Sequence, residues 1–424
     1  SVDLGTGRTA AAVAAGHYHT CAILDDASLV CWGDNAYGQL GDGTTTDSTI
    51  PVSVDVGSGR FAVAVSGGRR HTCAILDDAS LKCWGQNSYG QLGDGTTTTT
   101  STPVSVDLGS GRTAAALSAG NTHTCAVLDD SSLKCWGNGD SGELGTGSTS
   151  DSHSPVSVTF DAGRSVVAIA LGWYHSCAVL DNLTFQCWGE GGTGVLATGT
   201  TIDSNTPAYA SLGGSLIAVS ERDLDADGTL NILDTHIKGS QEGSIYSNST
   251  LAVAGGHTCT ILDNGSVSCW GSNQNGELGN GTATFGSSSP VIAALPSGRT
   301  AVVVGGGTSY TCTILDDGSV SCWGYNGVGN LGDGTTTGSS TPVSVLLPSG
   351  RTAAALSAGS LSVIHTCAIL DNGSVSCWGL NTYGQLGDGT GTSSSTPVGV
   401  LLPSGRSAVA VSVGQWFTCA ILDN

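Results

Sequence analysis

The sequence predicts an all-β fold, a β-propeller built from four-stranded blades. Three observations lead to this prediction. A unit of about 52 residues recurs along the 424-residue chain, each unit contains four short apolar or β-branched segments, and no window keeps the 3.6-residue period of a helix. Four short strands repeated seven or more times are typical of a propeller, in which each blade packs against its neighbours.

A Thr-Cys or Ser-Cys step marks each unit. Successive steps are 52, 52, 52, 82, 53, 55 and 52 residues apart, so one interval contains an insertion of about 30 residues. The steps are at Cys21, Cys73, Cys125, Cys177, Cys259, Cys312, Cys367 and Cys419. We therefore expect one propeller domain over residues 1–424, with an insertion at residues 221–247.

The four segments of a unit are illustrated by residues 9–16, 19–24, 81–85 and 102–106. Each is short, and each is bounded by Gly, Asp, Asn, Ser or Pro, which is the pattern of a β-strand. The third segment carries a Trp that we expect to pack between blades. These tryptophans are Trp32, Trp84, Trp136, Trp188, Trp270, Trp323 and Trp378.

The unit resembles the regulator of chromosome condensation repeat family. The resemblance is carried by Gly-x-x-His-Thr-Cys-Ala-Ile-Leu, by Thr-Pro-Val, and by Cys-Trp-Gly-x-Asn-x-Tyr-Gly-Gln-Leu-Gly at residues 31–41, 83–93 and 377–387. It implies a propeller, most often with seven blades, but no single activity. Members of the family include a nuclear nucleotide-exchange factor, secreted β-lactamase inhibitors and extracellular arrays.

The number of blades follows from counting the segments. Eight segments are of the Cys-Ala-Ile-Leu type, but only seven are of the Cys-Trp-Gly type. A closed ring of seven blades would leave half a unit over, and a ring of eight would lack one strand. A segment of a longer array fits equally well. The family resemblance favours seven blades.

Composition excludes several classes of protein. The net charge of −21 repels phosphate backbones, which argues against a nucleic-acid partner. No apolar run approaches the roughly 18 residues of a membrane span. The hydrophobic content of 39% is enough for a core. The chain begins at Ser1, contains no Met and shows no signal-peptide pattern, so we expect a processed form or a fragment.

Fourteen of the 15 cysteines form pairs ten residues apart. In one pair, a three-residue loop at residues 263–265, with Gly265 in the left-handed position, would place Cys259 directly opposite Cys269. Buried free thiols and a zinc site are the alternatives, but no Cys-x-x-Cys pair occurs. Disulfides predict an extracellular or cell-surface protein. The predicted pairs are Cys21–Cys31, Cys73–Cys83, Cys125–Cys135, Cys177–Cys187, Cys259–Cys269, Cys312–Cys322 and Cys367–Cys377.

The fifteenth cysteine, Cys419, lacks a counterpart ten residues on. Its partner is expected beyond Asn424, in a longer parent chain.

The insertion carries the pattern of a calcium loop. Carboxylates stand at loop positions 1, 3, 5 and 12, and a Gly stands at position 6. The predicted ligands are Asp223, Asp225, Asp227, Thr229 through its carbonyl, Asn231 and Asp234. With Asp at position 12, the loop resembles those of dockerins and other extracellular modules. The expected role of calcium is to order the insertion, and a solvated acidic loop is the alternative.

Two further residue types recur. A His precedes the Thr-Cys or Ser-Cys step in six units, which suggests either one structural hydrogen bond per blade or a central metal or catalytic ring. These residues are His19, His71, His123, His175, His257 and His365. A Gly-Arg step recurs in seven units, and its arginines are expected to pair with carboxylates such as Asp42, Asp94, Asp333 or Asp388.

No nucleophile elbow, phosphate loop or zinc-protease motif occurs, so the sequence predicts a protein that is not an enzyme. The favoured function is an extracellular structural or adhesive scaffold within a larger assembly. The alternative is a secreted propeller that binds or inhibits another protein through one face. Expected partners are a protein, a glycan or further copies. Five N-glycosylation sequons begin at Asn182, Asn248, Asn264, Asn280 and Asn372.

Overall fold

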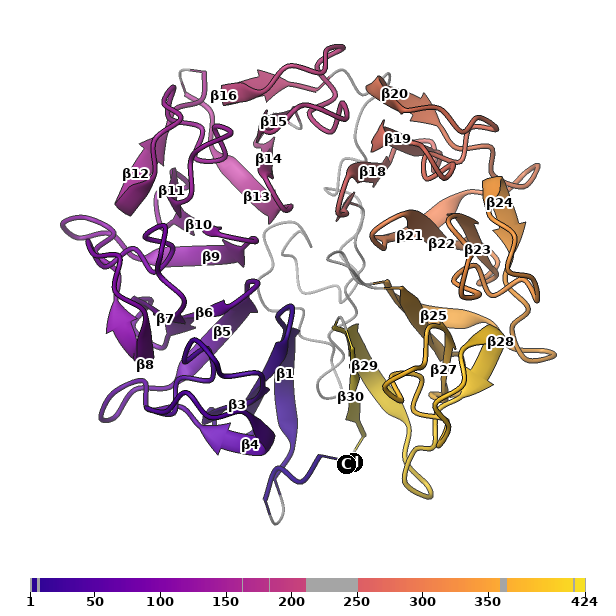
Figure 1. The fold of residues 1–424 in the computed structure, drawn as a ribbon, viewed down its shortest axis with the longest axis horizontal. Helices are drawn as coiled ribbons and strands as arrows, with labels where there is room; N and C mark the ends of the chain where they lie inside the picture. The colour runs from indigo at the N-terminus through magenta and orange to yellow at the C-terminus, as the bar shows by residue number, and fades with distance from the viewer. Residues whose placement is uncertain are drawn as a thin grey trace. The chain divides into compact units, whose positions relative to one another are not determined.

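The computed structural model describes residues 2–5, 8–161, 163–182, 184–210, 251–358, 364–414 and 416–423. Its fold class is the predicted one. The described residues form seven four-stranded antiparallel sheets, the blades of a seven-bladed β-propeller, and one further two-stranded sheet (Figure 1). No helix in this described part is long and apolar enough to cross a membrane.

The chain divides into two compact units. Unit 1 comprises residues 1–191 and 202–210, and unit 2 comprises residues 192–201 and 211–424. The assignment of residues 1–424 to one domain stays a prediction.

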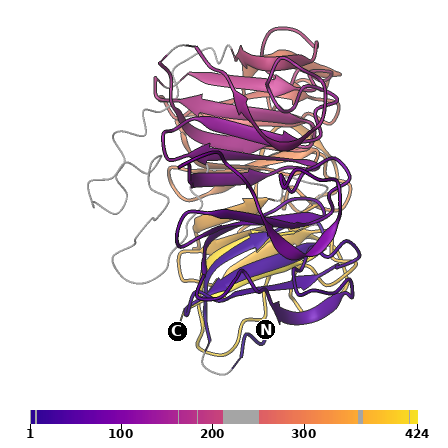
Figure 2. The ribbon, with the colours of Figure 1, turned by 90° about the vertical axis from the view of Figure 1, so that its left-hand side faces the viewer.

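Unit 1 holds four blades. Their strands are β1 (Ala10–Ala15), β2 (His19–Leu24), β3 (Leu29–Gly33) and β4 (Ser48–Ser53); β5 (Ala62–Gly67), β6 (His71–Leu76), β7 (Leu81–Gly85) and β8 (Thr100–Ser105); β9 (Ala114–Ala119), β10 (His123–Leu128), β11 (Leu133–Gly137) and β12 (Ser152–Val158); and β13 (Val166–Leu171), β14 (His175–Leu180), β15 (Phe185–Gly189) and β16 (Ser204–Tyr209). The first strands β1, β5, β9 and β13 contact one another in turn, and the sheets stack side by side (Figure 2).

Unit 2 holds three blades and the two-stranded sheet. Their strands are β17 (Leu251–Val253), β18 (His257–Ile261), β19 (Val267–Ser272) and β20 (Gly286–Ile292); β21 (Ala301–Gly306), β22 (Tyr310–Leu315), β23 (Val320–Gly324) and β24 (Ser339–Ser344); β25 (Ala353–Ala358), β26 (His365–Leu370), β27 (Val375–Gly379) and β28 (Ser394–Gly399); and β29 (Ala408–Val413) with β30 (Thr418–Leu422).

The core lies between blades, because both faces of the second strand in each four-stranded sheet are buried. In β2, Cys21 and Ile23 face a cluster that includes Ala74 and Trp84 of the next blade, whereas Ala22 packs in a separate cluster. Burial on both faces explains why these strands are continuous apolar runs. The predicted packing of the tryptophans is confirmed for six of them, which are fully buried, while Trp32 is half-buried. The six are Trp84, Trp136, Trp188, Trp270, Trp323 and Trp378.

All seven predicted disulfides are present, one in each four-stranded sheet. In each blade the two cysteines are direct partners in the pairing of the second and third strands, as Cys73 is with Cys83, and their Cα atoms are 4.1 Å apart. The predicted hairpin register is thus confirmed. Cys419 belongs to none of the seven pairs.

The hairpin loops have the predicted left-handed residue. Gly265 has φ 75°, and the same position is held at positive φ by residues other than glycine in three blades of unit 1. These residues are Ala27, Ala79 and Ser131, with φ of 64°, 60° and 61°. The loop geometry is therefore set by the pairing of the strands and does not depend on glycine.

Candidate functional site

The recurring histidines link neighbouring blades. In unit 1, Nε2 of His71 lies 3.0 Å from Oγ1 of Thr124 in the next blade. The same contact joins His19 to Thr72 and His123 to Ser176 in unit 1, and His257 to Thr311 and His365 to Thr418 in unit 2. The prediction of one structural hydrogen bond per blade is confirmed for these five residues.

The hydroxyl in this link fixes the tautomer of the ring. Oγ1 of Thr124 donates its single hydrogen to the carbonyl oxygen of Gln91, at 3.0 Å. It can therefore only accept from His71, so Nε2 of His71 carries the proton. Nδ1 of His71 is buried without a hydrogen-bond partner.

Burial keeps these imidazoles uncharged. It lowers the pKa of His71 to about 4 and, with smaller contributions from neighbouring histidines, lowers the pKa of His19 and His123 to about 3. The rings are neutral at pH 7 and are already engaged by neighbouring blades. Among the residues that the structure describes, no group of three His, Cys, Asp or Glu side chains could hold a metal ion. The geometry therefore favours the structural interpretation over a metal or catalytic ring.

The Gly-Gln-Leu-Gly loop completes the link. The carbonyl oxygen of Gln39 accepts from Oγ1 of Thr72 at 2.8 Å and from Nε1 of Trp84 at 2.9 Å. In other repeats, the carbonyl oxygens of Gln91, Glu143 and Glu277 accept the corresponding two bonds, one from a Thr or Ser hydroxyl and one from a Trp. One carbonyl thus satisfies two buried donors of the next blade, which gives this loop motif a structural role.

Tyr310 replaces the histidine in one blade of unit 2. Its longer side chain reaches the next blade, where its hydroxyl donates to the carbonyl oxygen of His365 at 2.8 Å and accepts from Thr366 at 2.9 Å. Burial raises the pKa of this phenol far above its usual value. The link between blades is therefore preserved with different chemistry.

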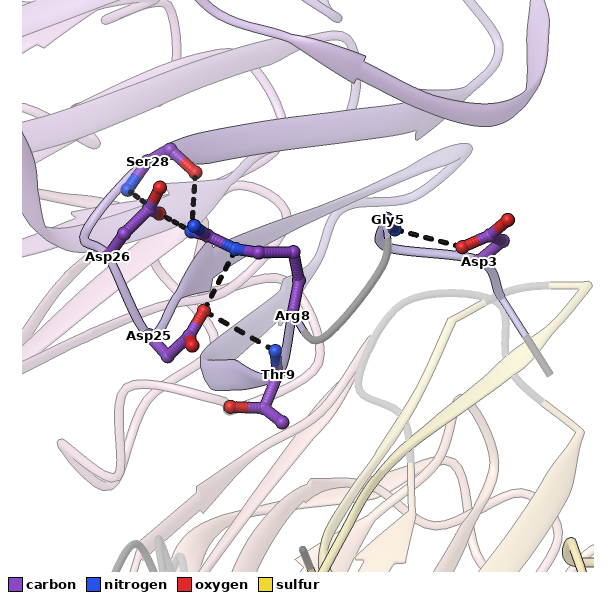
Figure 3. A network of polar contacts seen from close by, with 7 residues as sticks. All are labelled: Asp3, Gly5, Arg8, Thr9, Asp25, Asp26 and Ser28. Atoms are coloured by element: carbon purple, nitrogen blue, oxygen red, sulfur yellow. Dashed lines mark hydrogen bonds and ion pairs between the residues drawn. The ribbon is translucent and has the colours of Figure 1, made fainter.

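The arginines of the Gly-Arg step form ion pairs, but the predicted partners were wrong. Arg60 pairs with Asp77 and Asp78, which follow the second strand of its own blade. Figure 3 shows the corresponding contacts of Arg8 with Asp25 and Asp26. The carboxylates that we expected, such as Asp42, instead accept from an Asn and a Thr of their own loop, as Asp42 does from Asn35 and Thr44. Contacts between loops of one blade therefore determine which aspartates pair with the arginines and which accept hydrogen bonds within their own loop.

Two arginines of unit 1 differ from these. Seven of the described arginines have a carboxylate within 4.0 Å, and Arg69 and Arg70 are the remaining two of this described set. Both are half-buried, and both have an Nε atom that is buried without a hydrogen-bond partner.

Aromatic residues surround these two arginines. The guanidinium carbon of Arg70 lies 4.7 Å from the ring centroid of Tyr37 and 5.6 Å from that of Tyr18. Nη1 of Arg70 also donates to the hydroxyl of Tyr37 at 3.2 Å. We define the arginine–aromatic cluster as His17, Tyr18, Tyr37, Arg69, Arg70, Trp173 and Tyr174.

Most of the arginine–aromatic cluster comes from the loops that join the first two strands of a blade. His17 and Trp173, from the first and fourth blades, have ring centroids 6.5 Å apart, and Trp173 and Tyr174 are 6.2 Å apart edge to face. Burial, with the charges of Arg69 and Arg70, lowers the pKa of His17 to about 4. Sequence reasoning missed this cluster, although His17, Arg69 and Trp173 occupy the same position of the repeat, 52 and 104 residues apart, each directly after a glycine.

The predicted calcium ligands Asp223, Asp225, Asp227, Thr229, Asn231 and Asp234 lie outside the described residues. The calcium site therefore stays a prediction.

Comparisons with known proteins agree with the repeat. Two models described as the regulator of chromosome condensation (RCC1) repeat match this chain, one at residues 26–75, 81–127, 133–179 and 372–421, the other at 10–39, 62–91 and 114–143. Together they cover more than half of the sequence.

Among curated proteins, the ultraviolet-B receptor UVR8 of Arabidopsis thaliana is 27% identical over 387 residues, which are 91% of this chain and 80% of that protein. The E3 ubiquitin-protein ligase HERC2 of Homo sapiens is 26% identical over 391 residues, which are 92% of this chain but only 7% of that protein.

Solved structures show the same fold. Human WBSCR16 superimposes with a TM-score of 0.68 at 19% identity, covering 94% of this chain and 98% of that one. Prp20p from Saccharomyces cerevisiae gives a TM-score of 0.67 at 18% identity, covering 92% and 90%. On the repeat matches, the chain belongs to the regulator of chromosome condensation (RCC1) repeat family.

Proposed function

We propose that this chain is a non-enzymatic extracellular scaffold, a disulfide-linked propeller that acts as a structural or adhesive part of a larger protein or assembly. The observation that carries the proposal is the buried disulfide in every four-stranded sheet. Disulfides form and persist in oxidising compartments and are rare in the cytosol and nucleus. The net charge of −21 favours solubility and disfavours nucleic-acid binding.

The structural role of the recurring polar residues supports the absence of catalysis. The histidines and threonines that could have formed a catalytic ring are engaged in hydrogen bonds between blades. The relatives are consistent with a binding role. One solved structure is described by the binding of Prp20p to Gsp1p and histones, and another shows Kap60 bound to yeast RCC1.

Calcium is part of the proposal. The six predicted ligands of the insertion offer only oxygen atoms, the donors that Ca²⁺ prefers. Calcium bound there would order the insertion. Isothermal titration of the chain with CaCl₂ should show one site, and the triple variant Asp223→Ala, Asp225→Ala and Asp227→Ala should lose it. The triple variant Asp55→Ala, Asp107→Ala and Asp161→Ala removes the same charge from unit 1 and should retain it. Equal binding by both variants would contradict the calcium site.

The proposal as a whole is tested on native material. Antibody labelling of intact cells and of the culture medium should find the protein outside the cell, and mass spectrometry without reduction should find the seven pairs oxidised. A protein found only inside cells with reduced pairs would refute the extracellular scaffold.

A second function is favoured by one observation, the arginine–aromatic cluster of unit 1. A secreted propeller that binds or inhibits another protein would use such a surface, because Arg, Tyr and Trp are the residues that dominate protein interfaces. The test is affinity capture of proteins from the native extracellular fraction, with the Arg69→Gln, Arg70→Gln variant as comparison. Retention of a partner by the unchanged chain alone supports this function.

A further inference from the structure

The charges of unit 1 contrast with those of its arginine–aromatic cluster. The chain carries 34 Asp and Glu residues against 13 Lys and Arg. Yet Arg69 and Arg70 stand next to each other without a carboxylate within 4.0 Å among the described residues, while the Gly-Arg arginines of unit 1 all have one. The cluster is therefore a local cationic site on an acidic chain.

Several nitrogen atoms of the cluster are held in place by neighbouring side chains but have no hydrogen-bond acceptor. The ring of Tyr37 stacks against Arg70 and its hydroxyl accepts from Nη1, which orients the guanidinium. The Nε atoms of Arg69 and Arg70 and Nε2 of His17 are buried without hydrogen-bond partners. His17 is only 5% exposed. Buried donors without acceptors are unfavourable. Arg69 and Arg70 are themselves only half-buried, so a ligand can approach the exposed part of each side chain and supply acceptors there.

The shape of the missing acceptor follows from the donors. Guanidinium groups are planar forks that match the two oxygens of a carboxylate. His17 is neutral at pH 7, so the positive charge of the cluster comes from the two arginines. A carboxylate has two oxygens, so it can accept hydrogen bonds from both guanidinium groups at once. A polyanion such as nucleic acid would meet the repulsion of the remaining acidic surface.

The aromatic rings indicate what carries the carboxylate. Trp173 lies beside His17 and stands edge to face with Tyr174, which is 38% exposed. The ring centroid of Tyr18 lies 4.2 Å from that of His17, and Tyr18 also lies next to Arg70. Aromatic rings thus continue from Arg70 through Tyr18 and His17 to Trp173 and Tyr174, so the cluster combines cations with apolar ring faces. A carboxylate flanked by apolar or aromatic groups would satisfy both, and a peptide carries such groups on neighbouring side chains.

We propose that Arg69, Arg70 and His17 bind the carboxylate of an acidic residue in a partner peptide, with Tyr18, Trp173 and Tyr174 contacting the aromatic residues on either side of it. This inference deepens the second proposed function, since it names the chemistry of the partner, and it rests on that function for the partner being a protein.

The test uses the whole chain and two acetylated, amidated peptides, Phe-Asp-Phe and Phe-Asn-Phe, in isothermal titration at low salt and pH 7. The Asp peptide should bind at least tenfold more tightly than the Asn peptide. The double variant Arg69→Gln, Arg70→Gln should lose this preference. The control variant Lys82→Gln, Lys134→Gln removes two charges elsewhere in unit 1 and should keep it. Equal binding of the two peptides, or a preference that survives in the arginine variant, would overturn the proposal.

Two additions keep the result interpretable. Far-ultraviolet circular dichroism and thermal melting establish that the arginine variant is folded. If it is not, Arg70→Lys is used, which keeps the charge but loses the planar fork, and a preference reduced at least threefold supports the site. The two proposals can also fail separately. An Asp preference that depends on the arginines supports this site even if no native partner is captured. A native partner retained equally by the arginine variant overturns the site while leaving a binding function.

Discussion

His71 and Thr124, in neighbouring blades of unit 1, are joined by a hydrogen bond of 3.0 Å. The hydroxyl of Thr124 in turn donates a hydrogen bond of 3.0 Å to the carbonyl oxygen of Gln91. The hydroxyl of Thr124 therefore contacts two parts of the preceding blade, the side chain of His71 and the backbone of the loop that contains Gln91. Because the arrangement recurs, each such hydroxyl ties two parts of one blade to the next.

The first prediction concerns this hydroxyl. Thr124→Val should destabilise the protein by about 1–3 kcal/mol, because it leaves the buried Nε2 donor of His71 without an acceptor. Thr124→Ser should cost less than about 1 kcal/mol, since Ser176 performs the same role in the next blade. Urea unfolding followed by tryptophan fluorescence measures both. Equal losses for Val and Ser would show that the hydroxyl is not the important group.

The second prediction is acid sensitivity between pH 6.5 and about 4. His71 titrates near 6.5 when unfolded, but burial lowers its pKa to about 4 in the folded protein. The unfolded state therefore binds more protons in this window, and stability falls as the pH falls through it. The stability from neutral His71 is complete above pH 6.5 and is lost by up to about 1.4 kcal/mol per pH unit below it.

Urea midpoints measured from pH 7.5 to 4 check this dependence. His71→Gln, which keeps a donor but does not titrate, should show a shallower fall with pH than the unchanged chain. An identical pH profile would mean that His71 contributes nothing to acid sensitivity.

The third prediction concerns Glu143, which occupies the repeat position that Gln39, Gln91 and Gln385 hold in other repeats. Glu143 is 1% exposed, and burial raises its pKa to about 7. Its folded form holds the proton more strongly, so the stability that Glu143 contributes is complete below about pH 4.5 and is lost as the pH rises through 7.

Glu143→Gln should therefore stabilise the protein by about 1–2 kcal/mol at pH 8 and change little at pH 4.5. The amide oxygen can accept from the backbone N–H of Ser141, as Gln39 accepts from Tyr37 at 2.9 Å. Thermal melting at the two pH values measures the effect. The reciprocal variant Gln91→Glu should be destabilised at pH 8, and a gain for Glu143→Gln at both pH values would contradict the ionisation argument.

The fourth prediction concerns the close approach of the Gly41 backbone to Trp84. A Cβ at Gly41, where φ is 75°, would lie 2.6 Å from Nε1 of Trp84. Gly41→Ala should cost about 3 kcal/mol, from the left-handed backbone and the clash together. Gly59→Ala is the control, because it has φ 72° and nothing within 4 Å, so it should cost only about 1–2 kcal/mol. Chemical unfolding compares the two, and equal costs would exclude the clash.

The fifth prediction concerns the disulfides. The double variant Cys73→Ala, Cys83→Ala should lower the free energy of unfolding by about 2–3 kcal/mol. Without the disulfide, the unfolded chain gains conformational entropy, and folding must close this loop itself. The measurement is urea unfolding under oxidising conditions. Reduction of the unchanged chain should cost more than this one variant does, and a smaller loss on full reduction would contradict independent contributions from the seven disulfides.

Much of the fold could be predicted because the sequence repeats. The hairpin from Cys259 to Cys269 shows this most clearly, since the three-residue loop, the left-handed Gly265 and the facing cysteines all follow from eleven residues of local sequence. Local pairing of this kind needs no knowledge of distant parts of the chain. The structural role of the histidines was also predicted, although their partners were not.

The errors and omissions concern contacts between loops. Asp42 and Asp77 are both near an arginine in the repeat, and only the folded hairpin places Asp77, and not Asp42, beside Arg60. The arginine–aromatic cluster was missed for the same reason. His17 and Trp173 are 156 residues apart in the sequence, and all four blades of unit 1 must be stacked before their rings approach.

The sequence by itself therefore determined the strands, the disulfide pairs and the blade as the repeating unit, because all three depend on alternation and spacing within about 50 residues. Only the tertiary structure decided which side chains are neighbours across blades. It assigned the acceptor for five of the six recurring histidines, the carboxylate for each Gly-Arg arginine and the surroundings of Arg69 and Arg70. Those contacts depend on how one sheet stacks on the next, a relationship that no local pattern encodes.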